Sequence, residues 1–194
     1  MSNVNFIIAQ CLGVTATFIL CLSYMVKNKK SFLLISLLGD VVYGISFIFV
    51  NSFGAGLIVL LSCVQNLFFY YYSKSGKQTP IAISITFILL FVISGVSTFN
   101  TLWDIIPIVT YIWFTIVLYF KDMKVIRLMY VLPNILLAIY DLMVMAYASA
   151  FEDGIEAIFL ISIIIIDFIK SKKTSKVTNV YKNVKVIFEK QTQH

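Results

Sequence analysis

The sequence predicts an all-α integral membrane protein with seven transmembrane helices in a 3+1+3 parallel-repeat arrangement. Three observations carry this prediction: an apolar composition, seven hydrophobic runs of spanning length, and basic clusters that alternate with those runs. Hydrophobic residues make up 60% of the 194 residues and charged residues 12%, whereas soluble domains have about 45–50% and 25%. Most of the chain is therefore expected to lie in the bilayer, with no room for a separate soluble domain.

Each hydrophobic run is close to the roughly 20 residues that a helix needs to cross a bilayer. The first run contains no Lys, Arg, Asp or Glu and lacks the basic start and cleavage pattern of a signal peptide, so it is expected to remain as a helix. The third run ends in Tyr70, Tyr71 and Tyr72, at a boundary where aromatic rings favour the lipid headgroups. Four of the runs contain polar or charged residues. If any of these runs were not a membrane span, the basic clusters would no longer all lie on one side of the membrane. The seven runs are residues 5–26, 31–50, 54–72, 80–97, 102–120, 125–147 and 151–169.

The fifteen Lys and Arg residues fall into four clusters that alternate with the hydrophobic runs. Placing every cluster in the cytoplasm, as the positive-inside rule requires, gives an odd number of spans with the N-terminus outside and the C-terminus inside. The last cluster forms a basic tail, which is expected to orient the protein and to attract anionic lipid. The segment from Val184 to Phe188 alternates polar and apolar residues, which is compatible with a short strand, an interfacial segment or disorder.

Residue types exclude several chemistries. His194 is the only histidine and ends the chain, so bis-His haem, a zinc site and histidine-dependent catalysis are not expected. Cys11, Cys21 and Cys63 lie in apolar runs without metal-ligand spacing. Phosphate-binding and dinucleotide-binding glycine motifs are also missing. We therefore expect neither an enzyme nor a cofactor, a bound metal or a nucleic-acid partner.

An ungapped offset of 94 residues relates the first half of the chain to the second. Under this offset helix-perturbing residues meet each other twice, and the most central polar residues of the second and sixth runs also meet. The matched pairs are Gln10 and Asp104, Gly13 and Pro107, Gly39 and Pro133, and Asp40 and Asn134. After four additional residues in the second copy, Gly56 meets Gly154.

The repeat divides the chain into four parts. Residues 1–78 would form the first three-helix unit, 79–98 the linker helix, 99–170 the second three-helix unit and 171–194 the cytoplasmic tail. Because a single crossing separates the two units, both begin outside, and they would be related by an axis along the membrane normal.

Asp40 stands near the middle of its run, where insertion scales assign an ionised Asp a cost of roughly 2.5–3.5 kcal/mol. Two roles would offset this cost: contact with a solute or cation in a central cavity, or protonation and a hydrogen bond to a neighbouring helix. The match to Asn134 favours the first, so Asp40 and Asn134 are candidates for binding a solute. Gly39 and Pro133 directly precede them and would loosen the helices where backbone groups face a cavity.

Further polar and helix-perturbing residues complete the candidate site. Gly13 and Pro107 would either gate the outer mouth or form ordinary packing kinks, and Gln10 and Asp104 would line an outer vestibule. Gln65 and Asn66 point about 100 degrees apart on a helix, so one is expected to face the cavity and the other to join helices. Tyr43 would contribute to an aromatic wall, with lipid-facing or packing roles as the alternative. Structural roles are expected for Asp141, Glu156 and Asp167.

Several short motifs match a known family pattern. They are Ala9, Gln10 and Gly13; Tyr43 and Gly44; Ile106 to Ile108; Asn134, Ile139 and Tyr140; and Gly154 and Glu156. Over about residues 8–172 the chain resembles the bacterial YgjV-type inner membrane protein family, which is itself similar to the SWEET and PQ-loop group of carriers. The resemblance implies a multi-pass protein of the bacterial cytoplasmic membrane with a carrier-like fold. Pro107 stands where a PQ-loop proline would be, without the Gln that follows it, and Asn66 lies near a position where the family pattern has an Arg.

The leading hypothesis is a small-molecule transporter that works by alternating access between the two units. The rival hypothesis is a membrane receptor, immunity protein or scaffold with the same fold. No Lys or Arg is expected in the interior, which favours a small neutral or weakly cationic solute over a phosphorylated anion. Beyond the lipid bilayer and this solute, a homo-oligomer is the remaining partner compatible with the sequence.

Overall fold

The computed structural model describes residues 3–49, 53–97, 99 and 101–191. Within these residues the ordered elements are all helical, and the seven α-helices follow the seven predicted runs in order. They are α1 (Asn3–Met25), α2 (Lys29–Phe49), α3 (Phe53–Lys74), α4 (Ile81–Ser97), α5 (Ile105–Val117), α6 (Met123–Met143) and α7 (Tyr147–Gln191). A short 3-10 turn, η1 (Leu102–Asp104), precedes α5.

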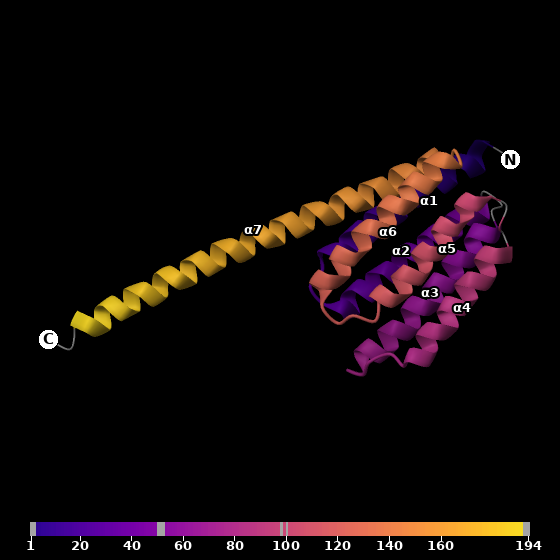
Figure 1. Ribbon diagram of the computed structural model, residues 1–194. Coiled ribbons are helices and arrows are strands. Elements are labelled where there is room, and N and C mark those ends of the chain that lie inside the picture. The colour runs from indigo at the N-terminus through magenta and orange to yellow at the C-terminus, as the bar shows by residue number, and fades with distance from the viewer. Residues whose placement is uncertain (1–2, 50–52, 98, 100, 192–194) are drawn as a thin grey trace.

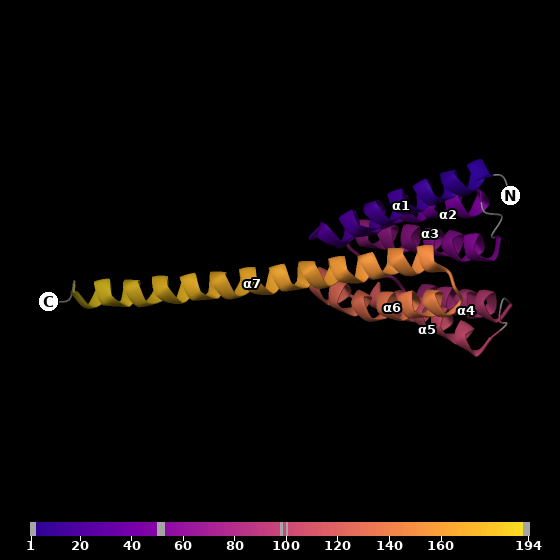
Figure 2. The same cartoon turned by 90° about the horizontal axis from the view of Figure 1, so that it is seen from above.

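The helices form a closed ring in which each one packs against the next along the chain, and α7 packs back against α1. Figure 2 shows α1, α2 and α3 on one side of the bundle and α4, α5 and α6 on the other, with α7 lying between α1 and α6. A ring of this kind leaves its central axis to be filled by side chains from many helices. The candidate site lies there.

Within the part of the chain that the structure describes, four helices are long and apolar enough to cross a membrane: α1, α2, α3 and α6. The helix α4 and the segment Leu102–Val117 are apolar but shorter. The first half of α7 carries Glu152, Asp153, Glu156 and Asp167 within a largely apolar stretch. Large apolar side chains are exposed along the whole bundle, among them Phe18, Ile48, Leu60 and Ile93. Such a surface is stable in lipid and would aggregate in water.

The last helix differs from the expected form of the tail. The structure continues α7 as one helix to Gln191, well beyond the bundle (Figure 1), where the sequence analysis expected a strand, an interfacial segment or disorder. Neither Gly nor Pro follows Gly154, and extending an existing helix needs no new nucleus. These two conditions favour helix over the local preference of Val and Ile for strands.

The two ends of the bundle differ in charge. The end at which α1–α2, α3–α4 and α5–α6 are connected carries Lys27, Lys77 and Lys121, and we call it the basic end. The opposite end holds the start of α1 and carries Asp104 and Asp141, and we call it the acidic end. In Figure 1 the start of α1 lies at the acidic end, and α7 extends past the basic end.

Pro133 lies inside α6 and is buried there. A proline has no N–H, so the carbonyl four residues earlier loses its helical partner. That carbonyl belongs to Met129, and it accepts a hydrogen bond of 2.9 Å from the indole Nε1 of Trp113 on α5. The backbone group freed by Pro133 is thereby used to join α5 to α6.

Candidate functional site

A cavity of about 130 Å³ lies on the bundle axis. Every helix except α4 contributes to its lining among the described residues, and the contributing positions recur at helical spacing, as with Thr17, Leu20 and Tyr24 on α1. The lining contains four carboxyl groups and no Lys, Arg or His. Its polar and aromatic members are Asp40, Glu152, Asp153, Glu156, Gln65, Asn66, Asn134, Thr17, Ser36, Ser62, Tyr24, Tyr43, Tyr111, Tyr130 and Phe114.

Asp40 is held by two side chains of α3. Its Oδ2 accepts hydrogen bonds from Asn66 Nδ2 at 2.7 Å and from Ser62 Oγ at 3.2 Å. Its Oδ1 accepts no hydrogen bond from the described residues. The carboxyl is therefore fixed in place through one of its two oxygens.

Glu156 is a second carboxyl group of the lining and lies on α7. Its Oε2 accepts a hydrogen bond of 2.8 Å from Tyr24 Oη on α1 and a longer one of 3.4 Å from Asn134 Nδ2 on α6. Glu156 and Asn134 are both buried. This carboxyl therefore links the first and last helices of the ring as well as lining the cavity.

The lining follows the 94-residue offset found in the sequence. The six lining positions on α1 and α2 correspond one by one to the six on α5 and its C-cap and on α6. The pairs are Thr17 and Tyr111, Leu20 and Phe114, Tyr24 and Leu118, Ser36 and Tyr130, Asp40 and Asn134, and Tyr43 and Leu137. This correspondence stops before the third helix of each unit, where the second copy has four additional residues.

A wider hollow of about 440 Å³ adjoins the cavity on the side of the acidic end. The two spaces share Tyr43, Val59, Tyr111, Leu137 and Asp153. The hollow continues to Asp104, Tyr140, Asp141 and Ser149, and Tyr140 Oη donates a hydrogen bond of 3.0 Å to Asp104 Oδ1. Its charged lining residues are all acidic. Acidic side chains therefore line both spaces between this end of the bundle and the carboxyl groups of Asp40 and Glu156, and we call the two adjoining spaces the acidic route.

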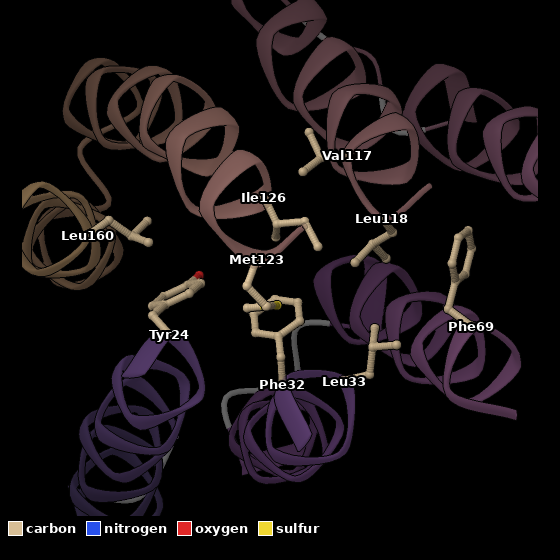
Figure 3. Close-up of a cluster of buried hydrophobic side chains, with 9 residues drawn as sticks. All are labelled: Tyr24, Phe32, Leu33, Phe69, Val117, Leu118, Met123, Ile126 and Leu160. Carbon is tan, nitrogen blue, oxygen red and sulfur yellow. The ribbon is translucent and has the colours of Figure 1, made fainter. Parts of the chain in front are cut away.

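A cluster of buried apolar side chains closes the cavity toward the basic end (Figure 3). It comes from every helix except α4, and its members are Tyr24, Phe32, Leu33, Phe69, Val117, Leu118, Met123, Ile126 and Leu160. We call it the basic-end plug. Tyr24 and Leu118 belong both to the plug and to the cavity lining, so the plug begins where the cavity ends.

Polar contacts surround the plug. Arg127 Nη1 forms an ion pair with Asp167 Oδ2 at 2.6 Å, and Arg127 Nη2 donates to the carbonyl of Val26 at 2.9 Å. Lys29 Nζ donates to the carbonyls of Leu118 and Phe120. These contacts join α6 to α7 and α1, and α2 to the end of α5. They hold the basic end shut in this structure.

A family model described as a bacterial inner membrane protein, Imp-YgjV, matches residues 7–173. The chain belongs to this family. The match covers six of the predicted runs in full and the first from residue 7 onward, and together with the apolar helices it places this YgjV-family protein in the bacterial inner membrane. Neither the curated proteins nor the solved structures contain a match to the chain.

The structure places five sequence-predicted residues of this YgjV-family protein around the cavity. Asp40, Asn134, Gln65, Asn66 and Tyr43 all belong to its lining. Gln65 and Asn66 do not divide their roles as expected, because both line the cavity and both bond a neighbouring helix. Gln65 Nε2 donates to Thr115 Oγ1 on α5 at 2.8 Å, and Asn66 bonds Asp40 on α2.

The four predicted gate residues lie at different kinds of position. Pro107 is in the first turn of α5, where no helical hydrogen bond is lost, and Pro133 is inside α6. Gly39 and Gly13 allow close packing: a Cβ would meet Leu20 Cδ2 at 2.8 Å at Gly39, and Glu152 Oε1 at 2.7 Å at Gly13.

The two predicted vestibule residues also lie at different places in the structure. Asp104 lines the wider hollow at the acidic end. Gln10 is half-buried on α1 and does not line the two spaces described above.

Sequence reasoning missed Glu156 and the buried position of Arg127. Glu156 was expected near the end of its run, but α7 begins at Tyr147, so Glu156 lies more than two turns inside the helix. The available signal was the spacing of Glu152 and Glu156, which puts both carboxyl groups on one helix face. Arg127 was grouped with the exposed basic cluster, yet its side chain is 4% exposed. It reaches the interior because Asp167 and the Val26 carbonyl compensate its charge.

Proposed function

We propose that this protein is a transporter of small organic cations across the bacterial inner membrane. The observation that carries the proposal is the axial cavity, whose four carboxyl groups face no Lys, Arg or His among the described lining residues. Carboxyl groups buried without a counter-charge are costly, and a cationic solute would supply that charge. Tyr43, Tyr111, Tyr130 and Phe114 also line the cavity and offer aromatic faces to a cation.

The size of the cavity limits the solute. A volume of about 130 Å³ is close to that of an engineered protein cavity of about 150 Å³ that binds benzene. A small amine or quaternary ammonium ion fits this space, whereas a disaccharide does not. Within the range of neutral and weakly cationic solutes that the sequence allows, the carboxyl groups favour the cationic ones.

The proposed mechanism is alternating access between two three-helix units in a seven-span 3+1+3 arrangement, similar to that of SWEET and PQ-loop carriers. Its support is the 94-residue correspondence between the cavity-lining positions on α1 and α2 and those on α5, its C-cap and α6. The acidic route and the basic-end plug correspond to a state open toward the acidic end, which the positive-inside rule assigns to the outside. The proposed cycle binds and moves the solute without chemical change.

Ligand binding and uptake test this proposal with a matched pair of compounds. Choline carries a permanent charge, and 3,3-dimethyl-1-butanol is its neutral isostere. Choline should raise the melting temperature of the purified protein by mass action, and the neutral isostere should not. Proteoliposomes containing the protein should then take up labelled choline faster than empty liposomes.

Two variants connect that result to the cavity. Asp40→Asn and Glu156→Gln remove one negative charge each at nearly constant volume. Each is expected to weaken choline binding by about tenfold or more, because opposite unit charges about 4 Å apart attract by about 4 kcal/mol at an effective dielectric constant of about 20. Equal stabilisation by choline and its isostere would contradict the cationic site. Binding without uptake would instead favour the receptor, immunity-protein or scaffold alternative.

A further inference from the structure

A second hollow, of about 380 Å³, lies at the basic end and plays no part in the proposed transport route. Its lining comes from the α1–α2, α3–α4 and α5–α6 connections and the adjoining helix ends. Lys27, Lys29, Lys77 and Lys121 converge on it from these three separate segments. No Asp or Glu belongs to the described lining.

The turn after α3 is built to bring one of these lysines back toward the bundle. Gly76 has φ 71°, a left-handed conformation that glycine adopts without strain. The Gly76 N–H bonds the Ser73 carbonyl and the Lys77 N–H bonds the Tyr72 carbonyl, which is the Schellman pattern of a helix C-terminus. The reversal of the chain places Lys77, Gln78 and Thr79 around the hollow.

Lys29 supplies a charge that the surrounding protein does not neutralise. It is half-buried, its Nζ lies 5.7 Å from the centre of the Phe69 ring, and its hydrogen-bond acceptors are the carbonyls of Leu118 and Phe120. The one ion pair formed within the described side chains is Arg127 with Asp167. A partly buried cation among three further lysines is stabilised when an anion occupies the hollow.

The position of the hollow indicates where that anion comes from. It lies where the apolar parts of α2, α3 and α4 begin or end, which is the level of the lipid headgroups for helices that span a bilayer. Ile81, Ile85 and Leu89 are exposed along α4 from this end and provide an apolar surface for acyl chains. Asn28, Ser73 and Thr79 add neutral hydrogen-bonding groups to the lining.

We propose that this basic-end hollow binds the phosphodiester headgroup of an anionic phospholipid. Lysines from three connections converge on one phosphate and so hold those connections together around the plug. Basic pockets between transmembrane helices at the cytoplasmic side recognise anionic headgroups by the same charge complementarity. The site is separate from the axial cavity and does not depend on what the cavity binds.

Lipid titration of the detergent-purified full chain tests the proposal with two variants of equal charge. The hollow variant carries Lys27→Gln, Lys77→Gln and Lys121→Gln. The control variant carries Lys30→Gln, Lys74→Gln and Lys124→Gln, three exposed lysines of the same clusters that lie outside the lining. Native mass spectrometry counts bound phosphatidylglycerol, and thermal unfolding measures its effect against phosphatidylcholine.

Phosphatidylglycerol should stay bound to the wild type and the control variant and raise their melting temperatures above the value in phosphatidylcholine. The hollow variant should lose affinity for phosphatidylglycerol by about tenfold or more relative to the control, since one lysine near a membrane surface is worth roughly fivefold. If both variants lost the same affinity for phosphatidylglycerol, the lipid would be attracted by the overall positive charge of the basic end. That result would overturn the proposed site.

Inorganic phosphate and glycerol 3-phosphate, tested without lipid, distinguish a soluble anion from a lipid. Stabilisation by either compound at least as strong as that by phosphatidylglycerol would overturn the lipid assignment. If the triple hollow variant does not fold, the single exchanges Lys77→Gln and Lys74→Gln form a second matched pair. The Lys77→Gln variant should then bind less phosphatidylglycerol than the Lys74→Gln variant, and equal binding by the two would again overturn the site.

Discussion

At the scale of single residues, Tyr24 connects the cavity to the basic-end plug. Its ring belongs to the plug, where it lies 5.8 Å from the Tyr130 ring and 5.9 Å from the Phe32 ring. Its hydroxyl donates the 2.8 Å hydrogen bond to Glu156 in the cavity. A cation that binds Glu156 would compete for the same carboxyl and so weaken a contact that keeps the plug together.

Tyr24→Phe should therefore destabilise the protein while keeping the plug filled. A hydrogen bond to a charged group contributes roughly 1.5–3 kcal/mol, and we expect a loss near the lower figure because Asn134 still donates to Glu156. The free energy of unfolding of wild type and variant, determined from a denaturation series in mixed micelles, measures this loss. Tyr130→Phe is the matched control, because it removes the same atom from a neighbouring ring whose hydroxyl makes no hydrogen bond to the described residues. Equal effects of the two variants would contradict the role of the Tyr24 hydroxyl.

At the scale of helices, two glycines in similar helical settings should respond oppositely to substitution. A Cβ at Gly39 would meet Leu20 Cδ2 and Cγ at 2.8 Å, whereas a Cβ at Gly154 would meet nothing within 4 Å. Gly154→Ala should stabilise the protein by roughly 0.5–1 kcal/mol, since alanine restricts the unfolded chain and favours helix. Gly39→Ala should destabilise by about 1–3 kcal/mol through overpacking of α1 against α2. Melting temperatures of the two variants decide the point, and a gain in both would mean that α1 and α2 move apart without cost.

The contact between α5 and α6 depends on the missing N–H of Pro133, which a double-mutant cycle can isolate. Trp113→Phe leaves the Met129 carbonyl without a donor, so it should cost about 1–3 kcal/mol for the unsatisfied group in addition to lost packing. In the Pro133→Ala background the Ala N–H can bond that carbonyl. The same Trp113→Phe change should then cost about 1 kcal/mol less. If the two substitutions had additive effects on the free energy of unfolding, the Trp113 indole would not compensate for the N–H that Pro133 lacks.

Hydrophobic runs were sufficient to predict where the helices lie, because lipid requires long apolar segments and water-exposed connections require polar ones. Asp40, Asn134, Gln65 and Asn66 were identifiable as candidates because polar groups far from the ends of an apolar run need a partner. Glu156 was not identifiable, because its depth in the bundle depends on α7 starting at Tyr147 and not at residue 151, where the predicted run begins. The partner of the Met129 carbonyl and the burial of Arg127 depend on contacts between distant segments, which no local pattern contains.

At the scale of the whole molecule, the two ends of the ring differ in access as well as in charge. The wider hollow leads from Ser149 and Asp141 at the acidic end to Leu137, which also lines the axial cavity. From the basic end the same residue lies behind the plug. The proposed alternating access therefore requires that Leu137 be accessible to solute from only one side of the membrane at a time.

Cysteine labelling with a membrane-impermeant thiol reagent tests this requirement and the orientation together. Cys11, Cys21 and Cys63 are first replaced by Ala, because they are free thiols. In that background Ser149→Cys should react on intact cells and Gln78→Cys should react in inverted vesicles, as the positive-inside rule predicts. Leu137→Cys should follow Ser149→Cys, because the structure opens toward the acidic end, and choline should lower its labelling rate by occupying the cavity. Reaction of Leu137→Cys mainly in inverted vesicles would place the open side at the basic end and contradict the role of the plug, while equal rates from both sides would indicate a channel rather than a carrier.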